Sequence, residues 1–183
     1  MAIKAPPMTA EEFEEYSLLP ENTDRRLELI AGEVVELVSN QKSGRITLKI
    51  GHLIMTYLDH NPIGYATPPD SGYRVGADRY QPDIAFISKA RQPIPSNDSY
   101  NPLAPDLAVE VISPTGETGD VVAKANGYIQ AGTTVWLVYP KRKEIHVWVP
   151  GQPIKKLGIN DTLDGGAVLP GFTASLEKIF EDE

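Results

Sequence analysis

The chain has 183 residues, and its 41% hydrophobic and 23% charged residues are ordinary proportions for a globular protein. It contains no cysteine, no apolar run of about 18 residues and no basic start followed by an apolar segment, which argues against a disulfide framework, a membrane span and export. The formal net charge of -8 argues against a broad basic surface for nucleic acid. We therefore expect one soluble domain over residues 1–183 in the cytoplasm, with any DNA contact confined to a small area.

The first segments predict a short helix followed by a hairpin. Thr9 with Glu12 three residues later is a helix N-cap pattern. Residues 26–30 and 33–38 then alternate in polarity around Ala31-Gly32, which is typical of a tight hairpin. Glu28 and Glu33 either point toward a functional site or occupy the polar positions of a half-exposed hairpin, and the pattern leaves both readings open.

Residues 42–58 change to a helical period, with an apolar face that includes Ile46, Ile50 and Ile54 and should pack on a sheet. Arg45 and Lys49 lie on an adjoining face. Such a basic stripe could contact the phosphates of a nucleic acid, or its side chains could simply be solvated beside the apolar face.

The rest of the chain predicts a mixed sheet with helices on its faces. Strands are expected at 71–75 and 82–87, joined by a polar turn at 76–79, and a long loop at 89–105 leads into the strand that holds Glu110. Further expected elements are a helix at about 117–131, strands at 133–139, 145–149, 155–157, 162–163 and 167–169, and a closing helix at 176–180. This order of elements predicts an α/β fold.

Glu110 lies inside an otherwise apolar strand. Because side chains alternate along a strand, Leu107, Val109 and Val111 share one face, and Glu110 shares the other with Ala108 and Ile112. A buried carboxylate requires a cation, a metal ion or a raised pKa. A structural ion pair on an edge strand is the alternative, although the prolines that bracket this apolar strand fit an edge poorly.

A second carboxylate, Asp83, begins a neighbouring predicted strand. If Asp83 and Glu110 converge, their oxygen atoms could hold a divalent cation such as Mg²⁺, which prefers hard oxygen ligands and phosphate. With a lysine nearby to balance charge on phosphorus, this set suits phosphodiester hydrolysis. Residue types alone do not establish that the two carboxylates converge.

Four stretches carry a resemblance to a known family. They are Pro82 to Ser88 (PDIAFIS), Ala104 to Pro114 (APDLAVEVISP), Lys124 with Tyr128, and Trp136 to Pro140 (WLVYP). In this order the chain resembles the Uma-two family of restriction endonuclease-like proteins, a branch of the PD-(D/E)XK nuclease superfamily, from the hairpin at 27–33 to residue 172. The resemblance implies a restriction endonuclease-like core, namely a mixed central β-sheet flanked by helices, with an added N-terminal hairpin and C-terminal strands.

The resemblance also implies a site. Asp83, Glu110 and Lys124 would be catalytic, and the expected metal ligands are Asp83, Glu110 and Val111. The superfamily places its lysine two residues after the glutamate, and this chain has Ile112 at that position. Members of the Uma-two family instead resemble one another in carrying a lysine on the following helix, and Lys124 occupies that place in this chain.

Two functions from different classes remain open. The first is a Mg²⁺-dependent endonuclease that cuts DNA and accepts Mn²⁺, with Glu28 and Tyr128 supporting the site, Arg45 and Lys49 contacting nucleic acid, and a homodimer for cutting both strands. The second is a degenerate nuclease fold that serves as a DNA-binding or protein-interaction module. Without the resemblance, Lys124 would be equally consistent with a solvated lysine that pairs with Asp120 one turn earlier.

Overall fold

A central sheet organises the molecule. The computed structural model describes residues 7–113 and 119–181. Within them, six strands form a mixed sheet in the order β11-β10-β9-β8-β6-β3, with only the β8–β9 pair parallel. Its strands are β3 (Gly64–Thr67), β6 (Ile84–Ser88), β8 (Leu107–Val111), β9 (Thr134–Tyr139), β10 (Glu144–Trp148) and β11 (Lys155–Leu157).

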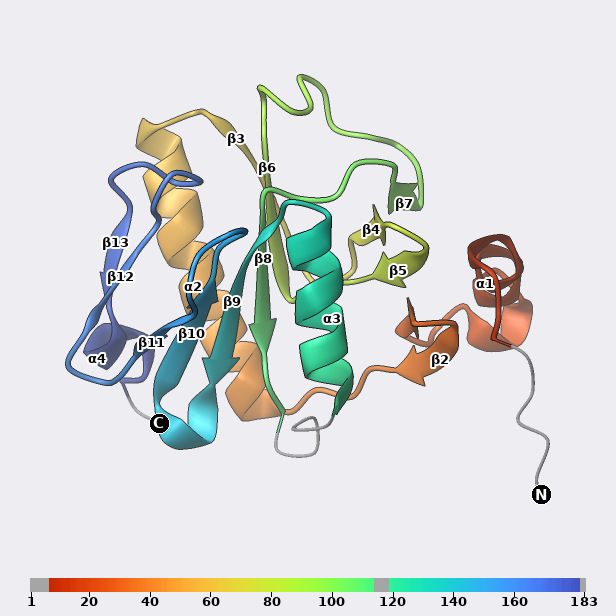
Figure 1. The fold of residues 1–183 in the computed structure, drawn as a ribbon, viewed down its shortest axis with the longest axis horizontal. Helices are drawn as coiled ribbons and strands as arrows, with labels where there is room; N and C mark the ends of the chain where they lie inside the picture. Colours follow the sequence, from red (N-terminus) through yellow and green to blue (C-terminus); the bar gives the residue numbers. More distant parts are fainter. Residues whose placement is uncertain (1–6, 114–118, 182–183) are drawn as a thin grey trace.

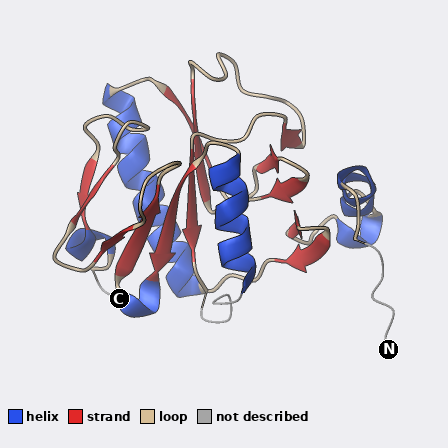
Figure 2. Cartoon of the chain, viewed as in Figure 1, coloured by secondary structure: helices blue, strands red, loops and turns tan. Residues whose placement is uncertain are grey.

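Two helices cover the two faces of this sheet, as Figures 1 and 2 show. Helix α2 (Gln41–His60) packs Ile46, Ile50 and Ile54 onto the apolar side chains of one face. Helix α3 (Gly119–Gln130) packs Ala125 and Tyr128 onto the other face. The fold is therefore the mixed α/β arrangement that the sequence predicted, with its main core divided by the sheet into two halves.

The predicted N-terminal hairpin is present and belongs to a second sheet. Within the described residues this sheet has the order β2-β1-β5-β4-β7. Its strands are β1 (Leu27–Ile30), β2 (Glu33–Glu36), β4 (Gly72–Val75), β5 (Asp78–Tyr80) and β7 (Tyr100–Asn101). Helix α1 (Ala10–Ser17), capped by Thr9 as predicted, packs Phe13 against Leu27 and Leu29 of the hairpin, and the short helix η1 (Pro20–Asn22) links the two.

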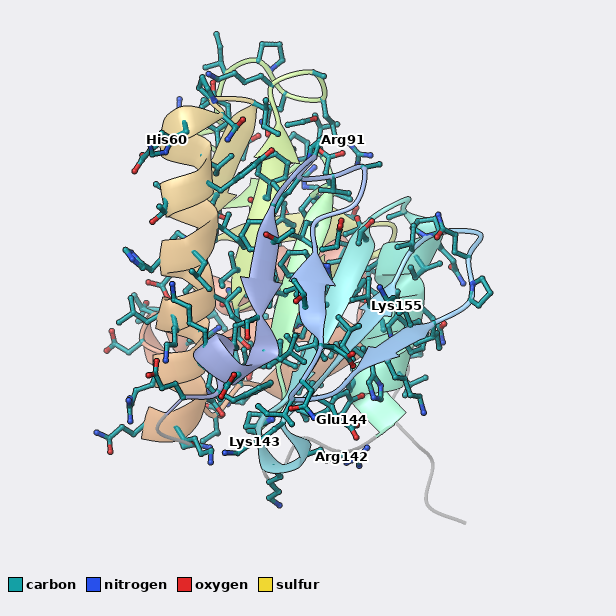
Figure 3. The ribbon with its side chains drawn as sticks, turned by 90° about the vertical axis from the view of Figure 1, so that its left-hand side faces the viewer. His60, Arg91, Arg142, Lys143, Glu144 and Lys155 are labelled. Atoms are coloured by element: carbon teal, nitrogen blue, oxygen red, sulfur yellow. The ribbon has the colours of Figure 1, made fainter. Side chains whose placement is uncertain are left out.

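The C-terminal segment closes the α2 side. Strands β12 (Thr162–Asp164) and β13 (Thr173–Ser175) pair with each other, and α4 (Leu176–Ile179) follows them. Their apolar residues, including Leu163, Phe172 and Leu176, join the core beneath α2, and Figure 3 shows this layer beside the helix. The helix η2 (Pro140–Arg142) forms the turn between β9 and β10.

Two local predictions were wrong, and two strands were not predicted. Residues 76–79 are not a turn that joins the strands predicted at 71–75 and 82–87. Gly76, in a left-handed conformation, instead lies in the tight turn between β4 and β5, and Asp78 already belongs to β5. The strand after Asp83 lies in the other sheet. Residues 167–169 form a turn instead of a strand, and β3 and the short β7 were not predicted. No described helix is long and apolar enough to cross a membrane.

Candidate active site

Strand β8 presents Glu110 to the α3 side of the sheet. It lies between β9 and β6, so Glu110 is not on an edge strand and the edge-strand alternative is wrong. The predicted alternation is confirmed, since Val109 and Val111 belong to the core under α2, whereas Ala108 and Ile112 belong to the core under α3. Glu110 therefore emerges among apolar neighbours beneath helix α3.

Lys124 of α3 provides the cation that a buried carboxylate needs. Its Nζ lies 2.9 Å from Oε1 of Glu110 and 2.6 Å from Oε1 of Glu28, and its side chain is only 8% exposed. Tyr128, one turn further along the helix, donates its hydroxyl to Oε1 of Glu110 at 3.0 Å. The reading of Lys124 as a solvated lysine is thus wrong, and the side chain of Asp120 lies outside the described residues.

Glu28 is the second carboxylate at Lys124. It is fully buried on β1, and its Oε1 also accepts a hydrogen bond from the Gln81 backbone N–H at 2.5 Å, while its Oε2 is buried without a partner. Glu33, at the other end of the hairpin, is exposed. Of the two open readings, Glu28 points into the site and Glu33 takes the exposed hairpin position.

Asp83 stands immediately before β6 and reaches the end of β8. Its Oδ2 accepts the backbone N–H of Val111 at 2.8 Å. The N–H and C=O of one strand residue point to the same side of the strand, so the Val111 carbonyl faces the side on which Asp83 lies. Asp83, Glu110 and the Val111 carbonyl thus gather at the end of one strand pair.

Burial and charge set the protonation of these groups. Burial raises the pKa of Glu110 to about 8, because loss of hydration outweighs the attraction of Lys124, and the nearby Glu28 and Asp83 charges raise it further. Burial also raises the pKa of Asp83. Burial by itself lowers the pKa of Lys124, but the Glu110 and Glu28 carboxylates reverse this and hold the pKa above its ordinary value, so the ammonium is charged.

A cleft of about 330 Å³ opens over these side chains. Its lining comes from the β1–β2 hairpin and the segment after it, the segment before β6, the end of β8, and α3. The lining residues are Arg26, Glu28, Ile30, Val35, Glu36, Leu37, Val38, Ser39, Gln81, Asp83, Glu110, Val111, Ile112, Ser113, Val121 and Lys124. An acidic floor with one buried ammonium therefore lies between largely apolar walls.

Comparison with known proteins identifies the family. A family model described as "Uma2: Putative restriction endonuclease" matches residues 11–177, which is most of the chain. The chain belongs to the Uma2 family.

A solved structure has a similar fold. A crystal structure described as that of a putative nuclease belonging to DUF820, from Anabaena variabilis ATCC 29413, has a TM-score of 0.83 and 22% sequence identity, covering 95% of this chain and 98% of that one. At this identity the likeness shows a shared fold. A search of the curated proteins found no match. The resemblance stated from the sequence is confirmed at the level of family and fold.

In this Uma2 chain an ammonium group reaches the glutamate from a helix. Ile112, at the position of the superfamily lysine, is 7% exposed and packs in the core under α3. Lys124 approaches Glu110 from α3 instead. The ring of Tyr80 lies 5.6 Å from Lys124 Nζ, and α3 can come this close because residue 127 is glycine, where an added Cβ would stand 2.5 Å from the Tyr80 hydroxyl.

The structure does not bring Arg45 and Lys49 to this cleft. Both belong to α2, which packs on the opposite face of the sheet, and neither lines the cleft. Lys49 instead lies 3.5 Å from the Glu181 carboxylate. Their contact with nucleic acid stays a prediction.

The oxygen atoms around Asp83 suit a hard divalent cation. Among the described residues, no group of three or more His, Cys, Asp or Glu side chains is arranged to hold a metal. Two carboxylates and one carbonyl are nevertheless the kind of incomplete ligand set that Mg²⁺ accepts, because it keeps several of its waters. Among the described residues the buried Oε2 of Glu28 has no hydrogen-bond partner, and the Glu28 and Asp83 charges both add to the rise in the Glu110 pKa that burial causes, so these carboxylates influence one another.

Several site residues were not predicted. Arg26 precedes Glu28 by two residues and therefore lies on the same face of the hairpin, so the alternation of the hairpin could have indicated it. Tyr80 and Gln81 lie between the turn predicted at 76–79 and the strand predicted at 82–87, and no role was predicted for them. Gln81 contributes its backbone N–H, and no side-chain pattern could have indicated that contact.

Proposed function

We propose that this chain is a divalent-metal-dependent endonuclease that hydrolyses phosphodiester bonds in DNA, with Mg²⁺ as its metal and Mn²⁺ as a substitute. The observation that carries the proposal is the Lys124 ammonium held between Glu28 and Glu110, in a cleft that Asp83 also lines. Membership of the Uma2 family supports the reaction class. We also expect a homodimer, because two sites are needed to cut both strands at once.

Asp83, Glu110 and the Val111 carbonyl would hold the metal. When bound, Mg²⁺ polarises a phosphoryl oxygen and makes a coordinated water more acidic. With Glu28, Asp83 and Glu110 counted as carboxylates and Lys124 as an ammonium, these four side chains carry a formal charge of about -2, although burial favours a proton on Glu110 until a cation binds. A divalent cation would therefore take the place of that proton.

Lys124 supplies positive charge and hydrogen bonds. Because its pKa is raised, it remains protonated at neutral pH and acts as a donor toward a phosphate oxygen instead of as a general base. A fixed charge of this kind stabilises the negative charge that develops on phosphorus in the transition state. Lys124 thus takes the role of the lysine that the superfamily places at the position of Ile112.

Glu28 keeps the ammonium in place. If Glu110 held a metal ion, Lys124 would share that carboxylate with a second cation and would be repelled from the cleft. Glu28 remains as a second partner at 2.6 Å, and the Gln81 N–H fixes the carboxylate that holds it. Tyr128 orients Glu110 through its hydroxyl. Glu28 and Tyr128 are therefore positioning residues.

A non-catalytic DNA-binding or protein-interaction module is the second candidate. Two observations favour it, namely the absence of a three-ligand metal cluster among the described residues and the engagement of Glu110 by Lys124 and Tyr128. Metal binding separates the two candidates, because a binding module has no need for a cation at Asp83.

The test combines calorimetry with a plasmid-nicking assay. The parent protein should bind Mg²⁺ or Mn²⁺ and nick supercoiled DNA, and Asp83→Ala or Glu110→Ala should abolish both. Glu36→Gln is the matched control, since Glu36 lines the same cleft but is exposed and pairs with Arg25. If both alanine variants bind metal like the parent, the metal site is excluded. A parent that cuts no nucleic acid with any divalent metal favours the binding module.

A further inference from the structure

Arg26 is a cation of the cleft that makes no ion pair with any acidic residue in the described part of the chain. Of the charged residues that line the cleft, Lys124 is tied to Glu28 and Glu110, and Glu36 pairs with Arg25 at 2.7 Å. Throughout 7–113 and 119–181, no carboxylate oxygen lies within salt-bridge distance of Arg26. The cleft holds three buried or half-buried carboxylates, yet the guanidinium of Arg26 forms an ion pair with none of them. Its positive charge is therefore available to a negatively charged ligand.

The side chain of Arg26 is held by neutral groups. Its Nη2 donates to the Pro69 carbonyl at 3.2 Å, and its own backbone carbonyl accepts the Leu37 N–H at 2.8 Å. The Nε–H is buried without a partner. A buried donor without an acceptor is destabilising, and an anion bound by the guanidinium would supply the missing acceptor.

Arg26 lies in the same cleft as the proposed metal ligands. Arg26, Asp83 and Lys124 all line it. The two cations enter the cleft from different elements, Lys124 from α3 and Arg26 from the residue immediately before β1. A phosphate group close to a metal at Asp83 would lie within the electrostatic reach of both.

We propose that Arg26 binds the phosphate group of a nucleic-acid backbone beside the metal site, as a substrate-binding residue of the cleft. A guanidinium offers parallel N–H donors that match two phosphate oxygens, and such pairs are stronger and more directional than a lysine contact. Arg26 would thus place the phosphodiester within reach of Lys124. This inference rests on the proposed function, because it names the group that holds that substrate.

Neighbouring Arg25 provides a matched control. It carries the same charge one residue earlier in the chain, but it is exposed and engaged by Glu36. A general loss of positive charge should affect both variants equally, whereas a phosphate contact should affect only Arg26.

The experiment measures DNA binding without cleavage. In a Lys124→Ala background with Mg²⁺ present, fluorescence anisotropy follows the binding of a fluorescein-labelled DNA duplex at several salt concentrations. Arg26→Ala should raise the Kd about tenfold and lower the salt dependence by about one phosphate contact, while Arg25→Ala should change the Kd by less than about threefold. Arg26→Lys keeps the positive charge and the aliphatic part of the side chain, so this variant should fold even if Arg26→Ala does not. It should lose part of the affinity for DNA.

A metal titration of the same variants completes the test. Removing a positive charge near Asp83 should leave Mg²⁺ affinity unchanged or increase it. If Arg26→Ala weakens Mg²⁺ binding, Arg26 acts on the metal ligands and the phosphate role is overturned. Equal Kd values for the Arg25 and Arg26 variants also overturn it. A parent protein that binds no DNA would instead reject the proposed substrate, and this outcome is distinct because it precedes any substitution at Arg26.

Discussion

The two faces of β8 differ in the kind of environment they enter. Toward α2 the strand presents Leu107, Val109 and Val111 to a core that is apolar throughout and is closed by the C-terminal segment. Toward α3, one residue away along the same strand, it presents Glu110 to Lys124 and a cleft. A shift of one position along the strand therefore separates a purely structural face from a face that can bind ligands.

The difference shows what makes a buried carboxylate tolerable here. Helix α3 places Lys124 and Tyr128 four residues apart on one side, so a cation and a hydroxyl reach Glu110 together. The buried residues that α2 contributes to this core are Ile46, Ile50, Ile54 and Leu58, all of them aliphatic. The partners on the covering helix, more than the strand itself, determine where a charge can be buried.

Moving the carboxylate to the other face should break the fold. Val109→Asp places a charge under α2 with no cation to meet it, and we expect a loss of at least about 4 kcal/mol in the free energy of unfolding, because an unpaired buried charge is among the most destabilising changes known. Urea denaturation of the variant and the parent measures this loss.

Two control variants separate the effect of charge from the effect of volume in Val109→Asp. Val109→Ala removes volume without adding charge and should lose about 1–3 kcal/mol, and Glu110→Gln on the opposite face should retain the stability of the metal-free parent. A Val109→Asp variant as stable as Val109→Ala would show that the two faces tolerate charge equally.

Removing the cation on the α3 side should impair cleavage more than metal binding. Lys124→Ala is expected to lower Mg²⁺-dependent DNA cleavage by about 10²-fold, which is the usual effect of deleting one charge-stabilising donor. Calorimetry should show that metal affinity is not reduced, because Lys124 is not a ligand. Lys155→Ala, at an exposed position of β11 that does not line the cleft, serves as the control and should cut like the parent. Full activity of Lys124→Ala in the nicking assay would refute its catalytic role.

The pH should affect the α3 side, and the change per pH unit should be smaller than the effect of either substitution. Since the pKa of Glu110 is raised to about 8, Mg²⁺ affinity should increase by up to about tenfold per pH unit below pH 8 and level off above it. Metal-free protein should lose stability over the same range from about pH 4.5 to 8, because the folded chain binds a proton there that the unfolded chain has released.

Calorimetry across this pH range, and denaturation in a chelator, measure the two trends. Glu110→Gln cannot ionise and should remove the stability trend. If the stability of the metal-free parent does not change between pH 5 and 8, the Glu110 proton is not retained in the folded chain.

The sequence by itself determined the local elements and the chemistry available to them. The hairpin around Ala31-Gly32, the long amphipathic α2 and the alternation along β8 were all predictable, because each depends on contacts or periodicity within a few residues. The ordered motifs around Asp83, Glu110 and Lys124 were also sufficient to indicate the Uma2 family.

Only the tertiary structure decided which of these residues meet. Glu28 and Glu33 look alike in the hairpin pattern, yet one is fully buried at Lys124 and the other is exposed. The division of β5 and β6 between two sheets, the Gln81 contact and the position of Arg26 in the cleft depend on how distant segments pack. Such contacts follow from burial and charge balance across the whole fold, and no local periodicity records them.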